Sequence, residues 1–207
     1  MHDAGEATPD ILVRRVRRLE YFTIGWNTLE GLVGVVAGAA AGSVSLVGFG
    51  LDSAIEVGSA LALIWRMSGE TDIHRREHRE RTALRVVGWC FLLLSSYIVV
   101  HALAQLVRRA APEGSVIGIG LTFASVVVMP MLARAKRGAA AALGSSVLRA
   151  DARQADFCAY LSAIVIAGLL FNRLFGWWWA DPVAGLVMAP IIAREGIHAL
   201  RGDPCCE

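Results

Sequence analysis

Residues 45–65 read SLVGFGLDSAIEVGSALALIW, a run that is almost continuously apolar apart from two acids, Asp52 and Glu56. The hydrocarbon core of a bilayer is about 30 Å thick, and a helix needs about 20 apolar residues to cross it. This run therefore predicts a membrane-spanning helix that carries two carboxyl groups into the membrane. Such groups are costly there unless they face a protein interior, so their presence also points to a functional site.

Five further stretches of similar length and hydropathy predict five more spanning helices, at residues 21–41, 84–106, 116–133, 146–171 and 178–197. They are too long and too continuously apolar for the alternating strands of a membrane barrel. The composition agrees, since 56% of the 207 residues are hydrophobic and 18% are charged, whereas soluble domains carry about a quarter charged residues. The expected fold class is therefore all-α, a polytopic membrane protein with six transmembrane helices.

The same composition excludes other classes of protein. The apolar content is far too high for intrinsic disorder. The net charge is only +2 and basic residues dominate no predicted folded face, which argues against a nucleic-acid partner.

Basic residues predict the orientation of the helices. Of the 20 Lys and Arg residues, only Arg108, Arg109 and Arg173 fall in the links on one side of the membrane. Because cytoplasmic loops carry the excess of basic residues, both termini are expected in the cytoplasm. We accordingly expect a basic cytoplasmic segment at 1–20, a six-helix membrane domain at 21–200 and a short cytoplasmic tail at 201–207. Residues 1–20 lack the apolar core of a signal peptide, so the first span is expected to remain as an anchor.

Three acids lie within the predicted spans: Glu30 in the first, and Asp52 and Glu56 in the second. Asp52 and Glu56 are four residues apart and therefore share one helix face. Two carboxylates this close repel each other unless a proton or a cation lies between them. That is the chemistry of a site that exchanges a divalent cation for protons. The alternative is that each acid is protonated and hydrogen-bonded to a neighbouring helix.

The fifth predicted span offers complementary groups. Gln154 and Cys158 are also four residues apart, and a thiolate is a good ligand for zinc-like metals while an amide oxygen is a weaker one. Cys158 could instead be a small buried residue that packs. Asp151, near the start of this span, is either a cap of the helix N-terminus or a gate for incoming cations.

Three motifs in this order resemble those of the cation diffusion facilitator family of metal exporters. The run SVSL at 43–46 leads to Asp52 and Glu56, ADARQ at 150–154 leads to Cys158, and DPVAGL at 181–186 opens the sixth span. The resemblance extends over residues 21–200 and implies six transmembrane helices. It is closest to a small bacterial branch of the family that lacks the C-terminal cytoplasmic domain.

The resemblance implies a tetrahedral divalent-metal site built by two residues of the second span and two of the fifth. By position these residues are Asp52, Glu56, Gln154 and Cys158. The family's fifth helix carries His and Asp where this chain has Gln154 and Cys158, and Glu56 stands in place of a shorter Asp. The donor types suit zinc or a similar ion better than Mg²⁺ or Ca²⁺.

The resemblance also implies a function, namely export of the divalent cation from the cytoplasm in exchange for protons. The exporter is expected to be a homodimer in a lipid bilayer, here the inner membrane of a bacterium. Glu30 and Asp151 are candidates for an accessory or proton-coupling role. No cofactor besides the transported cation and no enzymatic activity is expected. The alternative is a membrane sensor or scaffold that binds metal without transporting it, because Gln154 and Cys158 replace the family's ligands.

Three smaller features have two readings each. Gly34, Gly38 and Gly42 are four residues apart, so they predict close helix packing, either within the chain or between two copies of it. His74 and His78 lie in a charge-dense segment that is either a solvated helix face or a place of transient metal capture. The Cys205–Cys206 pair could bind metal or lipid, or be a dispensable tail.

Overall fold

Six helices make up nearly all of the part of the chain that the computed structural model describes, namely residues 9–67, 73–110, 112–144 and 146–201. They are α1 (Pro9–Ala41), α2 (Val44–Met67), α3 (Ile73–Arg108), α4 (Val116–Leu143), α5 (Ser146–Phe175) and α6 (Ala180–Arg201). No strand occurs in these ranges. The expected all-α fold with six helices is confirmed.

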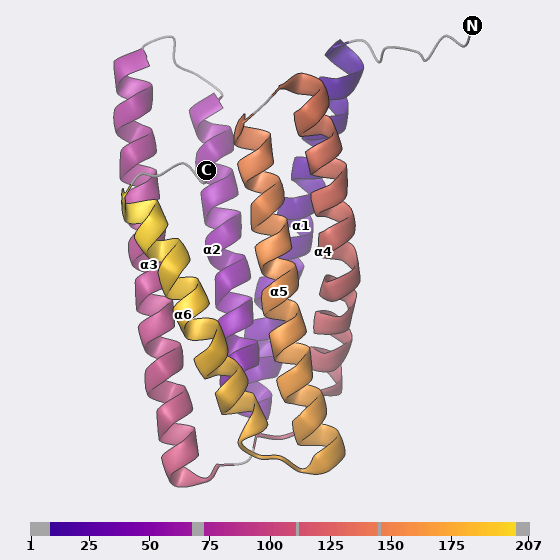
Figure 1. The fold of residues 1–207 in the computed structure, drawn as a ribbon, viewed down its shortest axis with the longest axis vertical. Helices are drawn as coiled ribbons and strands as arrows, with labels where there is room; N and C mark the ends of the chain where they lie inside the picture. The colour runs from indigo at the N-terminus through magenta and orange to yellow at the C-terminus, as the bar shows by residue number, and fades with distance from the viewer. Residues whose placement is uncertain (1–8, 68–72, 111, 145, 202–207) are drawn as a thin grey trace, which may run out of the picture.

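Successive helices run in opposite directions along the bundle (Figure 1). The start of α1 and the end of α6 consequently lie at the same end, which we call the terminal end. The distribution of basic residues predicts that the terminal end is cytoplasmic.

The helices associate most extensively in three pairs: α1 with α2, α3 with α6, and α4 with α5. Glycines allow the α1–α2 pair to approach closely. A Cβ atom added at Gly34 would lie 3.0 Å from Gly50 Cα, and one added at Gly38 would lie 2.7 Å from the Val47 nitrogen. Packing within the chain thus accounts for these two glycines.

Gly42 does not belong to this packing face, and our expectation that it does is wrong. It follows the last residue of α1 with a φ of 66°, and nothing lies within 4 Å of the position its Cβ would take. The Ser43 nitrogen donates to the Gly38 carbonyl at 2.9 Å across this turn. Gly42 therefore ends α1, where a left-handed backbone conformation favours glycine.

Three helices extend well beyond the predicted spans. The helix α1 begins at Pro9, α3 begins at Ile73 and α4 continues to Leu143. The apolar pattern marks the part of a helix that lies in lipid, whereas Arg, Glu and Ala are good helix formers that let it continue into water. The segment 1–20, expected as a cytoplasmic stretch, and the link between the predicted spans 45–65 and 84–106 therefore contain helix from Pro9 and from Ile73.

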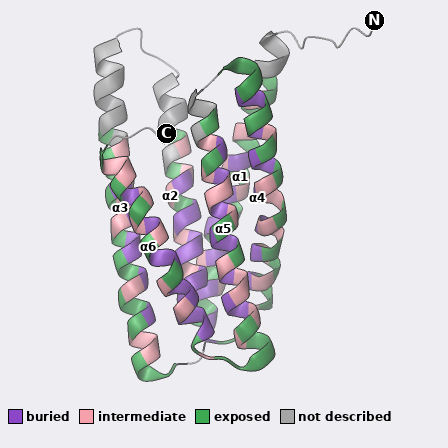
Figure 2. Ribbon diagram, viewed as in Figure 1, coloured by how far each residue is buried: buried purple, intermediate pink, exposed green. Residues whose placement is uncertain are grey.

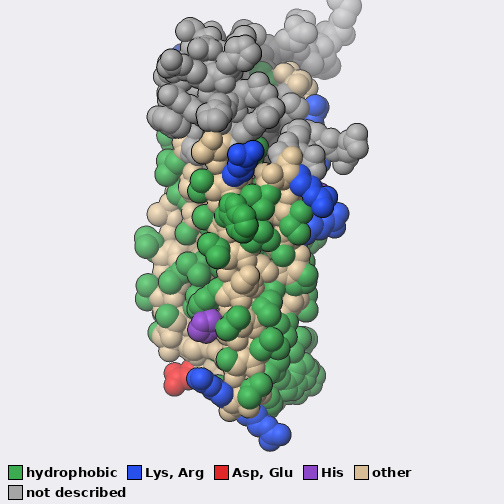
Figure 3. Space-filling model, turned by 90° about the vertical axis from the view of Figure 1, so that its left-hand side faces the viewer, with side chains coloured by type: hydrophobic (Ala, Val, Ile, Leu, Met, Phe, Trp, Pro, Cys, Tyr) green, Lys and Arg blue, Asp and Glu red, His purple; other side chains and the backbone are tan. Residues whose placement is uncertain are grey.

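The outer surface of the bundle is suited to lipid. Hydrophobic side chains cover the middle of the face in Figure 3, and Lys and Arg side chains gather toward its two ends. Within the described residues, every helix except α2 is long and apolar enough to cross a membrane. The helix α2 has 24 residues, a length of about 36 Å at 1.5 Å per residue. The chain is a polytopic membrane protein.

Candidate cation site in the bundle core

Polar side chains are buried inside the bundle beside a core of apolar ones, such as Phe49 and Met129, whereas other large apolar side chains face outward. On α1 the buried side is a stripe at three- and four-residue spacing that carries Thr23, Asn27 and Glu30. The buried side of α4 carries Thr122 and Ser125 in the same way. In Figure 2 the buried positions of several helices turn toward the middle of the bundle. A helix that is polar on its protein-facing side and apolar on its lipid-facing side positions these groups for a site inside the membrane.

Glu56 of α2 joins the first and fifth helices. Its Oε2 atom accepts a hydrogen bond from Asn27 Nδ2 at 2.6 Å, and its Oε1 atom accepts one from Gln154 Nε2 at 2.8 Å. Glu56 as a whole is 5% exposed. The structure thus brings together Glu56 and Gln154, two residues that were predicted from different spans.

Glu30 of α1 is fully buried and lies at the centre of a second group of polar side chains. Its carboxyl oxygens accept hydrogen bonds from Trp26 Nε1 at 2.5 Å, Ser53 Oγ at 3.2 Å and Ser125 Oγ. The Cys158 thiol also donates to Glu30 Oε2, at 3.7 Å. Glu30, considered above for an accessory role, therefore lies at the centre of these contacts and links α1 to α2, α4 and α5.

Asp52 has a different environment. Its side chain is fully buried, and neither of its carboxyl oxygens has a hydrogen-bond partner among the described residues. Glu56 lies four residues, about one helical turn, further along α2. A buried carboxyl group without donors, one turn from a second buried acid, fits a cation or a proton.

The four predicted ligands line the same interior, but they do not surround one point. Within the described ranges, no group of three or more His, Cys, Asp or Glu side chains is arranged to hold a metal ion. Glu56 is turned toward Gln154, whereas Cys158 is turned toward Glu30. The Cys158 side chain is completely buried.

The structure excludes one of the two roles considered for Asp151. The helix α5 begins at Ser146, so Asp151 lies inside the helix and cannot cap its N-terminus. Its carboxylate forms an ion pair with the Nζ atom of Lys136, which also lies 3.4 Å from Glu20 Oε2. Sequence reasoning missed Lys136, because the segment that contains it was expected to be a solvated link after residue 133.

A buried acid was missed as well, at the opposite end of the bundle. Asp181, near the start of α6, accepts hydrogen bonds from Ser43 Oγ at 2.6 Å, Ser45 Oγ at 2.5 Å and the Val44 nitrogen at 3.0 Å. The Ser43 hydroxyl in turn accepts from the Leu46 nitrogen at 3.1 Å and so caps α2. These contacts join two of the sequence motifs, SVSL at 43–46 and DPVAGL at 181–186.

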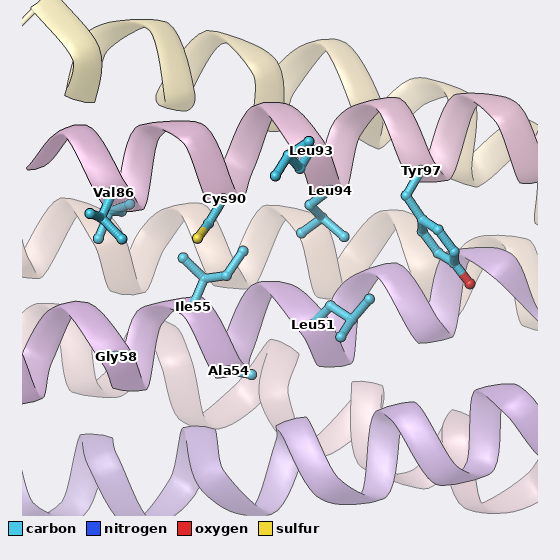
Figure 4. Close-up of a pocket in the computed structure, with 10 residues that line it drawn as sticks. Leu51, Ala54, Ile55, Gly58, Val86, Cys90, Leu93, Leu94 and Tyr97 are labelled. Atoms are coloured by element: carbon cyan, nitrogen blue, oxygen red, sulfur yellow. The ribbon is translucent and has the colours of Figure 1, made fainter.

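The bundle also has an apolar groove of about 730 Å³ that lies apart from these acids. It is lined by residues of α2 and α3, among them Leu51, Ile55, Cys90 and Leu94 (Figure 4). Val86 and Leu93 on its wall are more than half exposed. Apart from Cys90 and Tyr97, the lining residues carry no polar side chain, and the groove opens toward the lipid-facing side.

Two predicted features lie outside the described residues. They are the side chains of His74 and His78 and the Cys205–Cys206 pair.

Known proteins are similar to this chain in sequence. The family model of the cation efflux transmembrane domain matches residues 22–202. Transmembrane protein 163 of Xenopus laevis is 28% identical over 159 residues, which are 76% of this chain and 56% of that protein. An uncharacterized transporter of Methanocaldococcus jannaschii is 25% identical over 188 residues, 88% of this chain and 66% of the relative. The cation-efflux pump FieF of Shewanella oneidensis is 22% identical over 170 residues, 81% of this chain and 57% of the pump.

This chain thus spans a little over half to two thirds of the length of these relatives. The family model nevertheless covers most of the chain, from α1 to the end of α6. The chain therefore belongs to the cation efflux family, the family that its motifs predicted.

Proposed function

We propose that this protein is a secondary transporter that exports a divalent transition-metal cation, with zinc as the first candidate, in exchange for protons. The observation that carries the proposal is Asp52. Its carboxyl group is fully buried without a hydrogen-bond donor, one helical turn from Glu56, in the core of a cation efflux bundle. Two buried carboxyl groups of this kind are stable when a cation or protons compensate their charge.

The proposed ligands are Asp52, Glu56, Gln154 and Cys158. The helices that carry them lie in two different pairs, α1–α2 and α4–α5, and the Glu56–Gln154 hydrogen bond already spans the two pairs. A cation that binds Glu56 replaces this bond and the bond from Asn27. Carboxylate and thiolate donors together favour Zn²⁺ over the harder Mg²⁺ and Ca²⁺.

Proton exchange follows from the same contacts. A thiol binds zinc only after it loses its proton. The Cys158 thiol donates its hydrogen bond to Glu30, so Glu30 is the proposed acceptor of that proton. When the cation leaves, protons return to the thiol and to the carboxylates and remove their mutual repulsion. Rocking of the helix pairs would then expose the site alternately to the two sides of the membrane.

The setting of this transporter is also proposed. The terminal end would be cytoplasmic, in the inner membrane of a bacterium, and the working unit would be a homodimer. Support for the orientation comes from the basic residues, of which only Arg108, Arg109 and Arg173 are expected at the opposite end.

Zinc flux into proteoliposomes under an imposed pH gradient tests the proposal. Wild type should accumulate Zn²⁺ and move protons the other way, and Asp52→Asn should lose both activities. Asp156→Asn is the matched control, because it makes the same chemical change at a carboxylate that is paired with Arg137 near the surface. Its flux should stay at the wild-type level.

Zinc binding by isothermal titration calorimetry separates transport from the sensor or scaffold alternative. Binding that depends on Asp52, without flux of Zn²⁺, Mn²⁺, Co²⁺ or Fe²⁺ in folded protein, would replace the transporter by a sensor or scaffold. Equal flux in Asp52→Asn and Asp156→Asn would refute the proposed site.

A further inference from the structure

Lys136 of α4 is a fully buried lysine near the terminal end of the bundle. Burying an ammonium group is costly unless opposite charges compensate it. Two carboxylates do so here, Asp151 of α5 and Glu20 of α1. The three groups tie together the ends of three helices, two of which also carry groups of the proposed cation site.

The location of this cluster relative to the proposed site follows from the helix geometry. Asp151, Gln154 and Cys158 lie at positions i, i+3 and i+7 of α5, which share one face of a helix. Asp151 is therefore about 10 Å from Cys158 along the helix axis. A cation that comes from the terminal end to Glu56 or Cys158 along this face passes the Lys136 cluster first.

The exposure of the three groups differs in an informative way. The side chains of Glu20 and Asp151 are 21% and 24% exposed, whereas that of Lys136 is 0% exposed. Water thus reaches the two carboxylates in part, whereas the ammonium group is shielded from it.

We infer that Lys136 is a gate residue on the approach from the terminal end: its ammonium group clamps Glu20 and Asp151 together and closes the way to the acids of the core. A cation can then reach the core acids only after the ion pairs of Lys136 with Glu20 and Asp151 break. Lys136 is a positioning residue in this role, since it holds helix ends and does not bind the cargo. The inference rests on the proposed function for the identity of the cargo, but the closing of the passage can be tested without any cargo.

A second ion pair between α4 and α5 provides the comparison. Arg137 pairs with Asp156, but their side chains are 46% and 32% exposed. It links the same two helices from the outer surface. Exposed pairs contribute little because water screens them, and this one does not stand in the passage. Removing it should leave the passage closed.

The test measures how fast Cys158 reacts with a permanently cationic, membrane-impermeant methanethiosulfonate reagent. Cys90, Cys205 and Cys206 are replaced by Ser, so that Cys158 is the single thiol. Vesicles of both orientations allow the reagent to be added from either side. Metal is left out, so the reaction reports access whether or not the protein transports.

Lys136→Gln should increase the labelling rate from the terminal end about tenfold, which corresponds to about 1.4 kcal/mol. Labelling from the opposite end should not change, whereas a general loosening of the bundle would accelerate both. Arg137→Gln and Lys136→Arg should label at the wild-type rate, the second because it keeps the charge.

If Lys136→Gln is not monodisperse in detergent, Asp151→Asn replaces it and should show the same one-sided acceleration. The inference is overturned if the folded neutral variant labels within twofold of wild type from the terminal end, or if both ends accelerate alike. Absence of zinc flux with one-sided acceleration would leave the gate in place and count against the proposed function alone.

Discussion

The strongest prediction for stability concerns Asp181, which holds the start of α2 against the start of α6. Its Oδ1 atom accepts from the hydroxyl groups of Ser43 and Ser45, and its Oδ2 atom accepts from the Val44 nitrogen. In Asp181→Asn the remaining oxygen can still accept from the two hydroxyl groups. The new amide group then meets the Val44 N–H, so that two donors face each other.

A buried donor left without an acceptor costs about 1–3 kcal/mol of stability. For a chain of this length 1 kcal/mol corresponds to about 2–4 °C in Tm. We therefore expect Asp181→Asn to lower the Tm by roughly 2–12 °C. Asp181→Ala removes all three acceptor contacts and should lower it further.

Thermal unfolding in detergent, followed by intrinsic tryptophan fluorescence, measures this shift. Glu113→Gln is the control, because it makes the same acid-to-amide change on an exposed side chain in the link between α3 and α4. Surface substitutions usually change stability by less than about 0.5 kcal/mol. If Asp181→Asn and Glu113→Gln unfold at the same temperature, the Asp181 contacts do not stabilise the bundle and the reasoning is wrong.

Three further predictions concern helix packing and the core acids. Gly50→Ala should prevent the close approach of α1 and α2, because the new Cβ atom would lie 2.6 Å from the Val35 nitrogen; folded yield by size-exclusion chromatography should fall sharply. Gly58→Ala, with nothing within 4 Å of its Cβ, should keep the wild-type yield, and equal yields would contradict this account. Glu30→Gln should uncouple zinc flux from proton movement, which simultaneous recording of both in proteoliposomes would detect; an unchanged ratio would exclude Glu30 as the proton acceptor. Cys158→Ser should weaken zinc binding in calorimetry while Mn²⁺ binding changes less, because a hydroxyl is a harder ligand than a thiolate, and equal loss for both metals would indicate that the thiol only packs.

Most of the fold could be predicted from the sequence, because helices that contact lipid need long apolar stretches, which hydropathy detects. The lengths of the helices could not. The segments of α1 and α4 outside the predicted spans mix charged residues with apolar ones, so hydropathy alone does not distinguish them from links. Lys136 shows the consequence. A lysine that follows the last apolar residue of a span is normally solvated, and only the path of α5 beside α4 reveals that it is buried.

The candidate site was predictable where it depends on spacing within one helix. Asp52 and Glu56 share a face because four residues make about one turn. The contacts between helices were not predictable in this way. Nothing in the spacing of Glu30 and Cys158 indicates that their side chains meet, because that contact depends on how α1 and α5 pack against α2 and α4. Asp181 was visible as part of a motif, but its partners, Ser43 and Ser45, are more than a hundred residues away in the chain.

The division of the bundle into helix pairs has a consequence for how tightly a transport cycle can be coupled. Glu56 belongs to the α1–α2 pair, and Gln154 belongs to the α4–α5 pair, so the acidic core lies on the seam between them. Ionised acids on such a seam push the two pairs apart when no cation is bound. Like charges repel each other strongly in a medium of low dielectric constant. A carrier that has released its cation without taking up protons would then be unable to close around the empty site and reset. Slippage, the return of the empty carrier without exchange, would be suppressed by the same repulsion that makes the site bind cations.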